Sequence, residues 1–189
     1  IKNVNIITMD NNMTEYKNGF VIIEDENISY IGNMAELKED ESAIIIDGNN
    51  GILMPGMINT HTHLSMIPFR SLGDDCKDRL RRYLFPLENE CMNEKLAYYS
   101  AKYAICEMLL SGVTTIMDMY YFEDEVAKAS EEMGIRAFLG ETVINFPTCD
   151  SKDAFGGLDY SINFIEKWKN HKLITPFIAP HAPNTNDTN

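Results

Sequence analysis

The chain has 189 residues, of which 44% are hydrophobic, and its 16 Lys and Arg against 29 Asp and Glu give a formal net charge of -13. It is long enough to bury a core, and it has no apolar run of the roughly 18 residues that a transmembrane helix needs. Because the negative charge would repel nucleic-acid phosphates and anionic lipids, we expect neither nucleic acid nor a membrane as a partner.

The cysteines and the first residues indicate a reducing compartment. Cys76, Cys91, Cys106 and Cys149 form no Cys-x-x-Cys pair, and a chain of this length does not depend on disulfides. We therefore expect reduced and mostly buried thiols. The first residues lack the apolar core of a signal peptide, so we expect a cytoplasmic protein.

Short strands are predicted over the first part of the chain. Apolar residues alternate over residues 4–8, and β-branched or apolar runs cover residues 20–23, 28–31 and 44–46. Residues 1–54 are therefore predicted to form an all-β unit. About 50 residues are too few to close a core alone, so this unit is expected to pack on another part of the protein.

The pattern then changes to helical spacing. Apolar residues recur at this spacing between residues 77 and 109, and Pro86 is expected to divide the stretch into two helices. Gly112 supplies a helix stop before a β-branched run at 113–118, which predicts a buried strand.

Helices and strands continue to alternate in the rest of the chain. Helices are predicted at residues 122–133 and 158–170, and strands at 136–143 and 173–179. Strands that alternate with helices after an initial β unit predict a parallel α/β sheet or barrel.

His61-Thr62-His63 is the sharpest chemical signal in the sequence. Residues two apart in a strand point to the same face, so both imidazoles can bind one cation at the carboxyl end of the strand. Parallel barrels keep their active sites at that end. The simpler alternative is two ordinary histidines at a strand end.

Four other residues have weaker signals. Glu88 follows a proline and by itself is typical of a solvated helix residue. His181 lies between two prolines after an apolar strand, which suits either a strand-end site residue or a solvated loop. Asp118 could orient a metal ligand or cap the next helix. His171 precedes its strand, at the end away from the site, and is expected on the surface.

These motifs together resemble the amidohydrolase superfamily. Residues 53–63, Leu-Met-Pro-Gly-Met-Ile-Asn-Thr-His-Thr-His, look like the signature of its first barrel strand. Residues 69–75, 84–88, 112–115 with 118–120, and 179–183 are similar to the branch of methylthioadenosine and S-adenosylhomocysteine deaminases. Chlorohydrolases and guanine deaminases are related to this branch.

The resemblance implies a fold and a site. Residues 55–189 would form about strands 1–4 of a (β/α)₈ TIM barrel, and residues 1–54 half of a small β-sandwich. His61 and His63 would bind one divalent metal ion, with zinc first and iron, nickel or manganese as other candidates. Glu88 and His181 would bind a small amino-heterocycle such as methylthioadenosine or adenosine.

The resemblance also implies parts that follow residue 189. These are the acid and base residues and the further metal ligands, so no catalytic residue is assigned here. We expect the N-terminal part of a longer enzyme that hydrolyses non-peptide carbon–nitrogen bonds by deamination, with this part alone inactive and completed by its C-terminal half or a homo-oligomer. The alternatives are a guanine deaminase or chlorohydrolase relative, or a non-catalytic assembly fragment.

Two positions depart from the branch pattern. Where the family usually has an aromatic residue after His-Ala-Pro, this chain has Asn184, so we expect a different wall of the substrate pocket. Where the methylthioadenosine and S-adenosylhomocysteine deaminases place an arginine after the third strand, this chain has Glu141. An arginine would pair with an anionic substrate tail, whereas a glutamate would repel it. We therefore expect an uncharged or cationic substrate in preference to S-adenosylhomocysteine.

Overall fold

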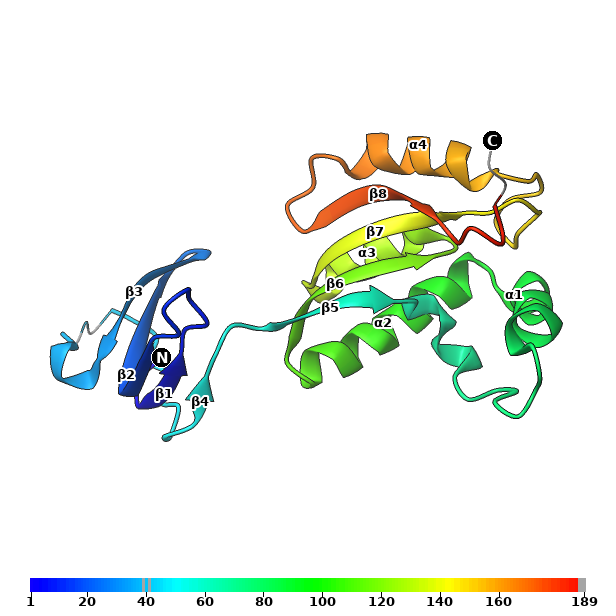
Figure 1. The fold of residues 1–189 in the computed structure, drawn as a ribbon. Coiled ribbons are helices and arrows are strands. Elements are labelled where there is room, and N and C mark those ends of the chain that lie inside the picture. The colour runs from blue at the N-terminus through cyan, green and yellow to red at the C-terminus, as the bar shows by residue number, and fades with distance from the viewer. Residues whose placement is uncertain (39, 41, 187–189) are drawn as a thin grey trace. The chain divides into compact units, whose positions relative to one another are not determined.

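The chain divides into two compact units in this computed structural model, Ile1–Gly56 and Met57–Asn189, and the structure describes residues 1–38, 40 and 42–186 (Figure 1). The first unit contains β1 (Val4–Ile7), β2 (Glu15–Glu24), β3 (Asn27–Asn33), the 3₁₀-helix η1 (Met34–Glu36) and β4 (Ile52–Leu53). Its sheet has the order β3-β2-β1-β4, with β1 antiparallel to β2 and parallel to β4. Val4, Ile6 and Val21 form its small core.

The strand predicted at residues 44–46 is wrong. These residues are in irregular backbone, and the Ile44 side chain is 93% exposed. Only the carbonyl of Ile46 reaches the sheet, where it accepts a hydrogen bond from the Lys2 backbone N–H. A β-branched run forms a strand only where a sheet edge is free to pair with it, and β4 takes that edge of β1.

The second unit alternates strands and helices. Its strands are β5 (Met57–Thr62), β6 (Val113–Tyr120), β7 (Arg136–Val143) and β8 (Ile174–Pro180). Its helices are the 3₁₀-helix η2 (Leu64–Phe69), the π-helix η3 (Leu80–Leu84), α1 (Phe85–Cys91), α2 (Glu94–Leu110), α3 (Glu123–Met133) and α4 (Gly157–Trp168). No helix in the described part of the chain is long and apolar enough to cross a membrane.

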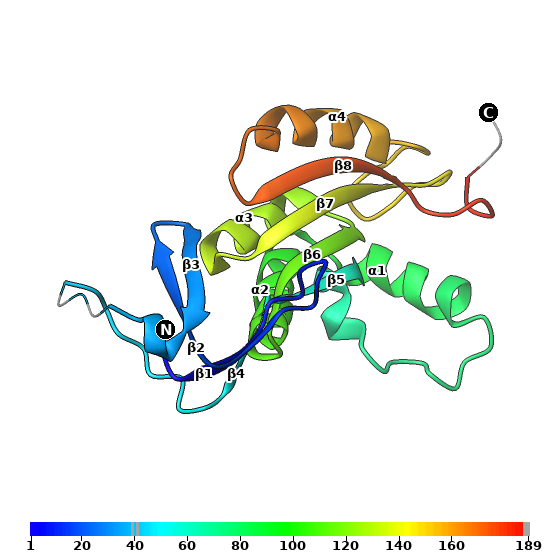
Figure 2. The same ribbon diagram turned by 60° about the vertical axis from the view of Figure 1, so that its left-hand side comes forward.

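The four strands of this unit form a parallel sheet in the order β5-β6-β7-β8. Figure 2 shows α2, α3 and α4 against one side of this curved sheet. Alternation along β6 directs Ile116 and Asp118, both fully buried, toward the helices, whereas Met117 is 40% exposed. The core between sheet and helices is built from small and branched apolar residues such as Ala101, Ile105, Val126, Ile135 and Leu139. The carboxyl ends of all four strands therefore lie at one edge of the layer.

The predicted elements from residue 112 onward are confirmed. The strands at 113–118, 136–143 and 173–179 correspond to β6, β7 and β8, and the helices at 122–133 and 158–170 to α3 and α4. The parallel α/β organisation is also confirmed. The half barrel and half sandwich remain predictions from the family resemblance.

The helix break predicted at Pro86 lies elsewhere. Pro86 is in the first turn of α1, where its missing N–H costs nothing, and the wider turns of η3 lead into it without interruption. The chain becomes extended at Met92 and Asn93 instead, and the Asn93 side chain accepts a hydrogen bond from the Leu96 N–H to begin α2.

The expectation of mostly buried thiols is also wrong. All four cysteines are free, but Cys91 and Cys106 are exposed, and Cys76 and Cys149 are only half-buried. Cys106 is on the outer side of α2, so the helix presents it to solvent although the sequence around it is apolar.

Candidate functional site

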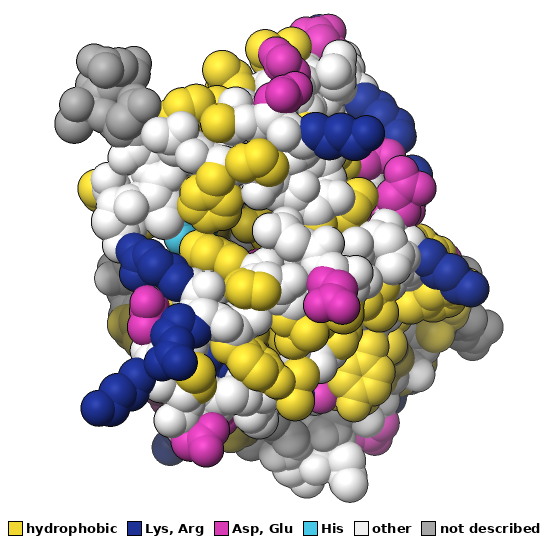
Figure 3. All heavy atoms as spheres, turned by 90° about the vertical axis from the view of Figure 1, so that its right-hand side faces the viewer, with side chains coloured by type: hydrophobic (Ala, Val, Ile, Leu, Met, Phe, Trp, Pro, Cys, Tyr) yellow, Lys and Arg dark blue, Asp and Glu magenta, His cyan; other side chains and the backbone are white. Residues whose placement is uncertain are grey.

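The carboxyl end of the parallel sheet carries the candidate site. Figure 3 views this end, where hydrophobic side chains cover much of the face, a histidine is visible beside them, and Lys and Arg side chains lie toward the edges on both sides. Short segments after β5, β6 and β8 bring polar groups to the same end.

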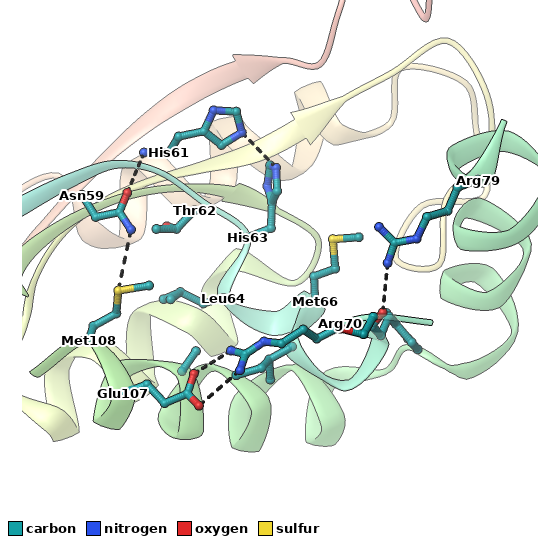
Figure 4. Close-up of a pocket in the computed structure, with 14 residues that line it drawn as sticks. Asn59, His61, Thr62, His63, Leu64, Met66, Arg70, Arg79, Glu107 and Met108 are labelled. Carbon is teal, nitrogen blue, oxygen red and sulfur yellow. Dashed lines mark hydrogen bonds and ion pairs between the residues drawn. The ribbon is translucent and has the colours of Figure 1, made fainter. Parts of the chain in front are cut away.

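His61 and His63 bring two imidazole nitrogens together at the end of β5. Nε2 of His61 lies 3.3 Å from Nε2 of His63, and the rings meet edge to face (Figure 4). In a tetrahedral zinc site with metal–nitrogen bonds of about 2.0–2.1 Å, two ligand nitrogens are separated by about 3.3 Å. The pair therefore has the spacing of two ligands to one cation.

The backbone of β6 sets which nitrogen of His63 faces His61. Nδ1 of His63 lies 2.5 Å from the carbonyl oxygen of Met119. Because a carbonyl oxygen can only accept, Nδ1 carries the proton and donates it, and Nε2 keeps its lone pair. Proteins commonly orient histidine ligands by such a hydrogen bond at the other ring nitrogen.

The described residues supply only part of a metal site. No group of three or more His, Cys, Asp or Glu side chains among them could hold a metal ion. A catalytic zinc takes three protein ligands and keeps one position open. The histidine pair fits two of those three positions.

A cavity of about 320 Å³ lies beside the histidine pair (Figure 4). On its wall, Arg70 forms a two-pronged ion pair with Glu107 of α2, with N–O distances of 2.6 and 3.2 Å. Neither Glu88 nor His181 lines this cavity. The histidines therefore border it, while the predicted substrate residues lie outside its wall.

Glu88 is a buried residue of α1 rather than a solvated one. Only 3% of it is exposed, and its Oε1 accepts a 2.8 Å hydrogen bond from the Tyr120 hydroxyl. Burial raises the pKa of Glu88 to about 6, although the Tyr120 hydrogen bond and the charge of His63 act in the opposite direction. The centroid of the Tyr120 ring is 6.1 Å from that of the His63 ring, so Tyr120 links Glu88 to His63.

His181 is held by backbone and side-chain hydrogen bonds. Its N–H donates to the Val143 carbonyl, and its Nδ1 lies 2.7 Å from Oγ1 of Thr185. The Thr185 hydroxyl donates its one proton to the Ala182 carbonyl, so Nδ1 of His181 is the donor in this contact. Burial, and then the charge of His63, lower the pKa of His181. His63, Glu88 and His181 are therefore within electrostatic range of one another.

Asp118 forms hydrogen bonds with the residues on both sides of His63 and does not cap a helix. Its Oδ1 accepts hydrogen bonds from the Thr62 hydroxyl at 2.5 Å and the Leu64 N–H at 2.8 Å. At the start of α3, the Phe122 N–H donates instead to Asp150 and the Glu123 N–H donates to Glu141. Of the two roles that the sequence left open for Asp118, the structure favours orienting a metal ligand over capping the next helix.

The argument from Glu141 against anionic substrates is wrong. Glu141 is fully buried, and Oε2 accepts a hydrogen bond from the Glu123 N–H at the start of α3. Its position in β7 matches those of Ala137 and Leu139, which pack against the helices. The side chain therefore points to the helix layer and cannot repel a substrate tail at the site.

Sequence reasoning missed Tyr120 and Thr185. Tyr120 ends β6 and Thr185 is four residues after His181, and these positions were the available signals. His171, expected away from the site, precedes β8 and contacts Glu131 at 3.1 Å.

Comparisons with known proteins identify the family. Residues 52–188 match the profile of the amidohydrolase family. The chain is 41% identical to the 5-methylthioadenosine/S-adenosylhomocysteine deaminase of Carboxydothermus hydrogenoformans and 37% identical to the 5'-deoxyadenosine deaminase of Methanosarcina mazei. Each alignment covers 98% of this chain and 42% of the relative, so the chain spans less than half the length of these relatives.

Solved structures show the same fold. A zinc-bound adenosine deaminase of Xanthomonas campestris superposes with a TM-score of 0.81 at 23% identity, over 97% of this chain and 43% of that one. Atrazine chlorohydrolase of Arthrobacter aurescens, complexed with zinc, gives a TM-score of 0.84 at 18% identity, over 98% of this chain and 47% of that one. At these identities the likeness concerns the fold alone.

Proposed function

The chain belongs to the amidohydrolase family, and from this premise we propose that the intact protein is a metal-dependent hydrolase that deaminates an amino-heterocycle. The observation that carries the proposal is the 3.3 Å approach of the Nε2 atoms of His61 and His63 at the end of β5. The relatives at 37–41% identity that are named as nucleoside deaminases support an adenine nucleoside as the substrate.

His61 and His63 hold the metal ion in this proposal. Zinc is the first candidate because two neighbouring structures contain it, with iron, nickel and manganese as the alternatives. A bound divalent ion supplies Lewis acidity and lowers the pKa of water toward neutrality. Met119 keeps Nε2 of His63 directed at the ion, and the third protein ligand comes from outside the described residues.

Glu88 and His181 bind and orient the substrate. Tyr120 occupies Oε1 of Glu88, so Oε2 is left to accept hydrogen bonds from substrate hydroxyls such as those of a ribose. With a pKa of about 6, Glu88 is mostly ionised at pH 7 and acts as an acceptor. Thr185 fixes Nδ1 of His181 as a donor, which directs Nε2 with its lone pair toward the ligand.

The overall reaction adds one water molecule and releases ammonia. A carbon–oxygen bond forms at the ring carbon that carries the exocyclic amine, and the carbon–nitrogen bond breaks. The acid and base groups that move the protons are assigned to no residue of this chain. S-adenosylhomocysteine remains among the candidate substrates, because Glu141 faces the helices.

Ammonia release from the intact protein tests the proposal. The panel contains methylthioadenosine, S-adenosylhomocysteine, 5'-deoxyadenosine, adenosine and guanine, with metal content measured on the same samples. We expect His61→Ala together with His63→Ala to remove both the metal and the activity. His171→Ala, at the other end of β8, is the matched control and should keep both. Activity that survives the double substitution would refute the proposal.

The guanine arm of this panel and three further measurements separate the alternatives. Activity confined to guanine, or chloride release from a chlorinated triazine, would move the protein to the guanine deaminase or chlorohydrolase relatives. A metal-free, inactive oligomer on size-exclusion chromatography would favour a non-catalytic assembly role. A homo-oligomer that binds metal agrees with the proposal, as does a cytoplasmic location in cell fractionation.

A further inference from the structure

Residues 117–119 of β6 form hydrogen bonds with residues 62–64, the segment that contains His63. The Met117 carbonyl lies 2.9 Å from the Thr62 hydroxyl, and the Met119 carbonyl accepts from Nδ1 of His63. Between them, Oδ1 of Asp118 accepts from the Thr62 hydroxyl and the Leu64 N–H. Asp118 is the only one of the three to use its side chain.

These hydrogen bonds fix the backbone on both sides of His63. Asp118 binds the residue before it and the residue after it, so the His63 backbone cannot rotate without breaking one of these bonds. The ring is then aimed by Met119. We propose that Asp118 is a positioning residue that sets the direction of the His63 imidazole, an inference that rests on the proposed role of His63 as a metal ligand.

The other oxygen of Asp118 needs a donor. Asp118 Oδ2 and both carboxyl oxygens of Glu123 are buried with no hydrogen-bond partner among the described residues. Glu123 is the first residue of α3 and is fully buried beside Asp118 and Glu141, and burial with these two neighbours raises its pKa. Two buried carboxyl groups in contact bond to each other when one carries a proton.

Glu123 in its acid form therefore completes the arrangement. Its O–H donates to Oδ2 of Asp118, while Oδ1 of Asp118 accepts from the Thr62 hydroxyl and the Leu64 N–H. Glu141 is satisfied separately by the N–H groups of Glu123 and Thr142. A purely packing role would not explain two adjacent buried acids, since apolar side chains fill such space without a desolvation cost.

Asp118→Ala and Asp118→Asn in the intact protein test the proposal. The readouts are zinc affinity, by competition with a chelator, and the ¹⁵N shifts of the His63 ring in metal-free protein, which report its tautomer. We expect Asp118→Ala to weaken zinc binding about 10–100-fold and to mix the tautomers. Asp118→Asn keeps an acceptor for Thr62 and Leu64 and a donor toward Glu123, so it should restore both readouts to within a few-fold of wild type.

Glu123 and Thr62 provide independent tests. Glu123→Gln keeps a donor to Asp118 and should retain zinc affinity, whereas Glu123→Leu removes the donor and should weaken it. Thr62→Val nearly preserves shape and should weaken zinc binding several-fold, a result that remains informative if Asp118→Ala fails to fold. Glu141→Gln changes an equally buried acid whose side chain accepts from the Glu123 and Thr142 N–H groups; it is the control and should leave zinc affinity unchanged.

The outcomes distinguish this inference from the proposed function. Wild-type zinc affinity and His63 tautomer in Asp118→Ala or Thr62→Val would overturn the positioning role while leaving deamination intact. Equal losses in Asp118→Asn and Asp118→Ala would also overturn it. If Glu141→Gln lost as much zinc affinity as Asp118→Ala, the loss would be due to general destabilisation of the sheet and not to the position of His63. Failure of His61→Ala with His63→Ala to affect the metal would instead refute the proposed function.

Discussion

The hydroxyl of Tyr120 donates a 2.8 Å hydrogen bond to Oε1 of Glu88, and both side chains are at least 95% buried. This pair connects α1 to the end of β6, next to the His63 ring. The bond stabilises the ionised form of a carboxyl group whose burial favours the neutral form. Two predictions depend on this balance.

Tyr120→Phe should weaken substrate binding. Without the hydroxyl, the pKa of Glu88 rises further, so less of the carboxylate is available near pH 7 to accept from substrate. A loss of about 1 kcal/mol corresponds to roughly a fivefold higher KM, with kcat changed less. Steady-state ammonia release measures both constants. Tyr121→Phe, on the neighbouring buried ring, is the control, and an equal rise of KM in both variants would argue against the Glu88 bond.

Glu88 should make folding stability depend on pH. Its folded pKa of about 6 is above the ordinary glutamate value of about 4.5, so the folded state binds the proton more tightly than the unfolded state. This contribution is fully present below about pH 4.5 and is lost as pH rises through 6, up to about 2 kcal/mol. Urea unfolding from pH 4.5 to 7 should show a shallower decline in Glu88→Gln than in wild type. Parallel curves would contradict the raised pKa.

Sequence patterns predicted the second unit well because its elements are long and periodic. The strands β6 and β7 are rich in β-branched or apolar residues, and Gly112 and Gly134 end the helices before them with φ values of 81° and 72°. Residues 44–46 in the first unit have equal β propensity, but of these only Ile46 bonds to the sheet, and β4 pairs with β1 at Asn5 and Ile6. Whether such a run forms a strand depends on its pairing with a neighbouring strand, which the local sequence does not determine.

The candidate site was predicted only where spacing fixes geometry. His61 and His63 are two residues apart at a strand end, so their convergence follows from the strand period. The family position of Glu141 does not show which face of β7 its side chain takes, whereas its parity with Ala137 and Leu139 directs it to the helices. The Tyr120 and Thr185 contacts depend on how separate segments meet, which no local pattern contains.

Leu139→Ala should destabilise the second unit strongly. Leu139 is fully buried between β7 and the helices, and removing a side chain from such a core costs about 2–5 kcal/mol. Leu110→Ala is the matched control, since Leu110 is 89% exposed and should change stability by less than about 0.5 kcal/mol. Denaturant unfolding of both variants measures the difference. Similar midpoints would mean that β7 does not lie on this core.

Asn93→Ala should test the helix start that replaced the one predicted at Pro86. The Asn93 side chain accepts from the Leu96 N–H at 3.1 Å, and loss of such a cap costs about 1 kcal/mol. Asn93→Asp keeps the acceptor and should be close to wild type in urea unfolding. If both variants lose the same stability, the capping bond is not the cause.

Thr185→Val should weaken substrate binding through His181. The Thr185 hydroxyl accepts from Nδ1 of His181 at 2.7 Å and so holds the ring and its tautomer. Valine has a similar shape but no acceptor, so Nδ1 loses its partner and Nε2 no longer stays directed at the ligand. We expect KM to rise about fivefold, equivalent to about 1 kcal/mol, with a smaller change in kcat. Thr185→Ser keeps the hydroxyl and should restore the wild-type KM. An unchanged KM in Thr185→Val, with His181 ring ¹⁵N shifts equal to wild type, would show that the backbone bond from His181 to Val143 orients the ring without Thr185.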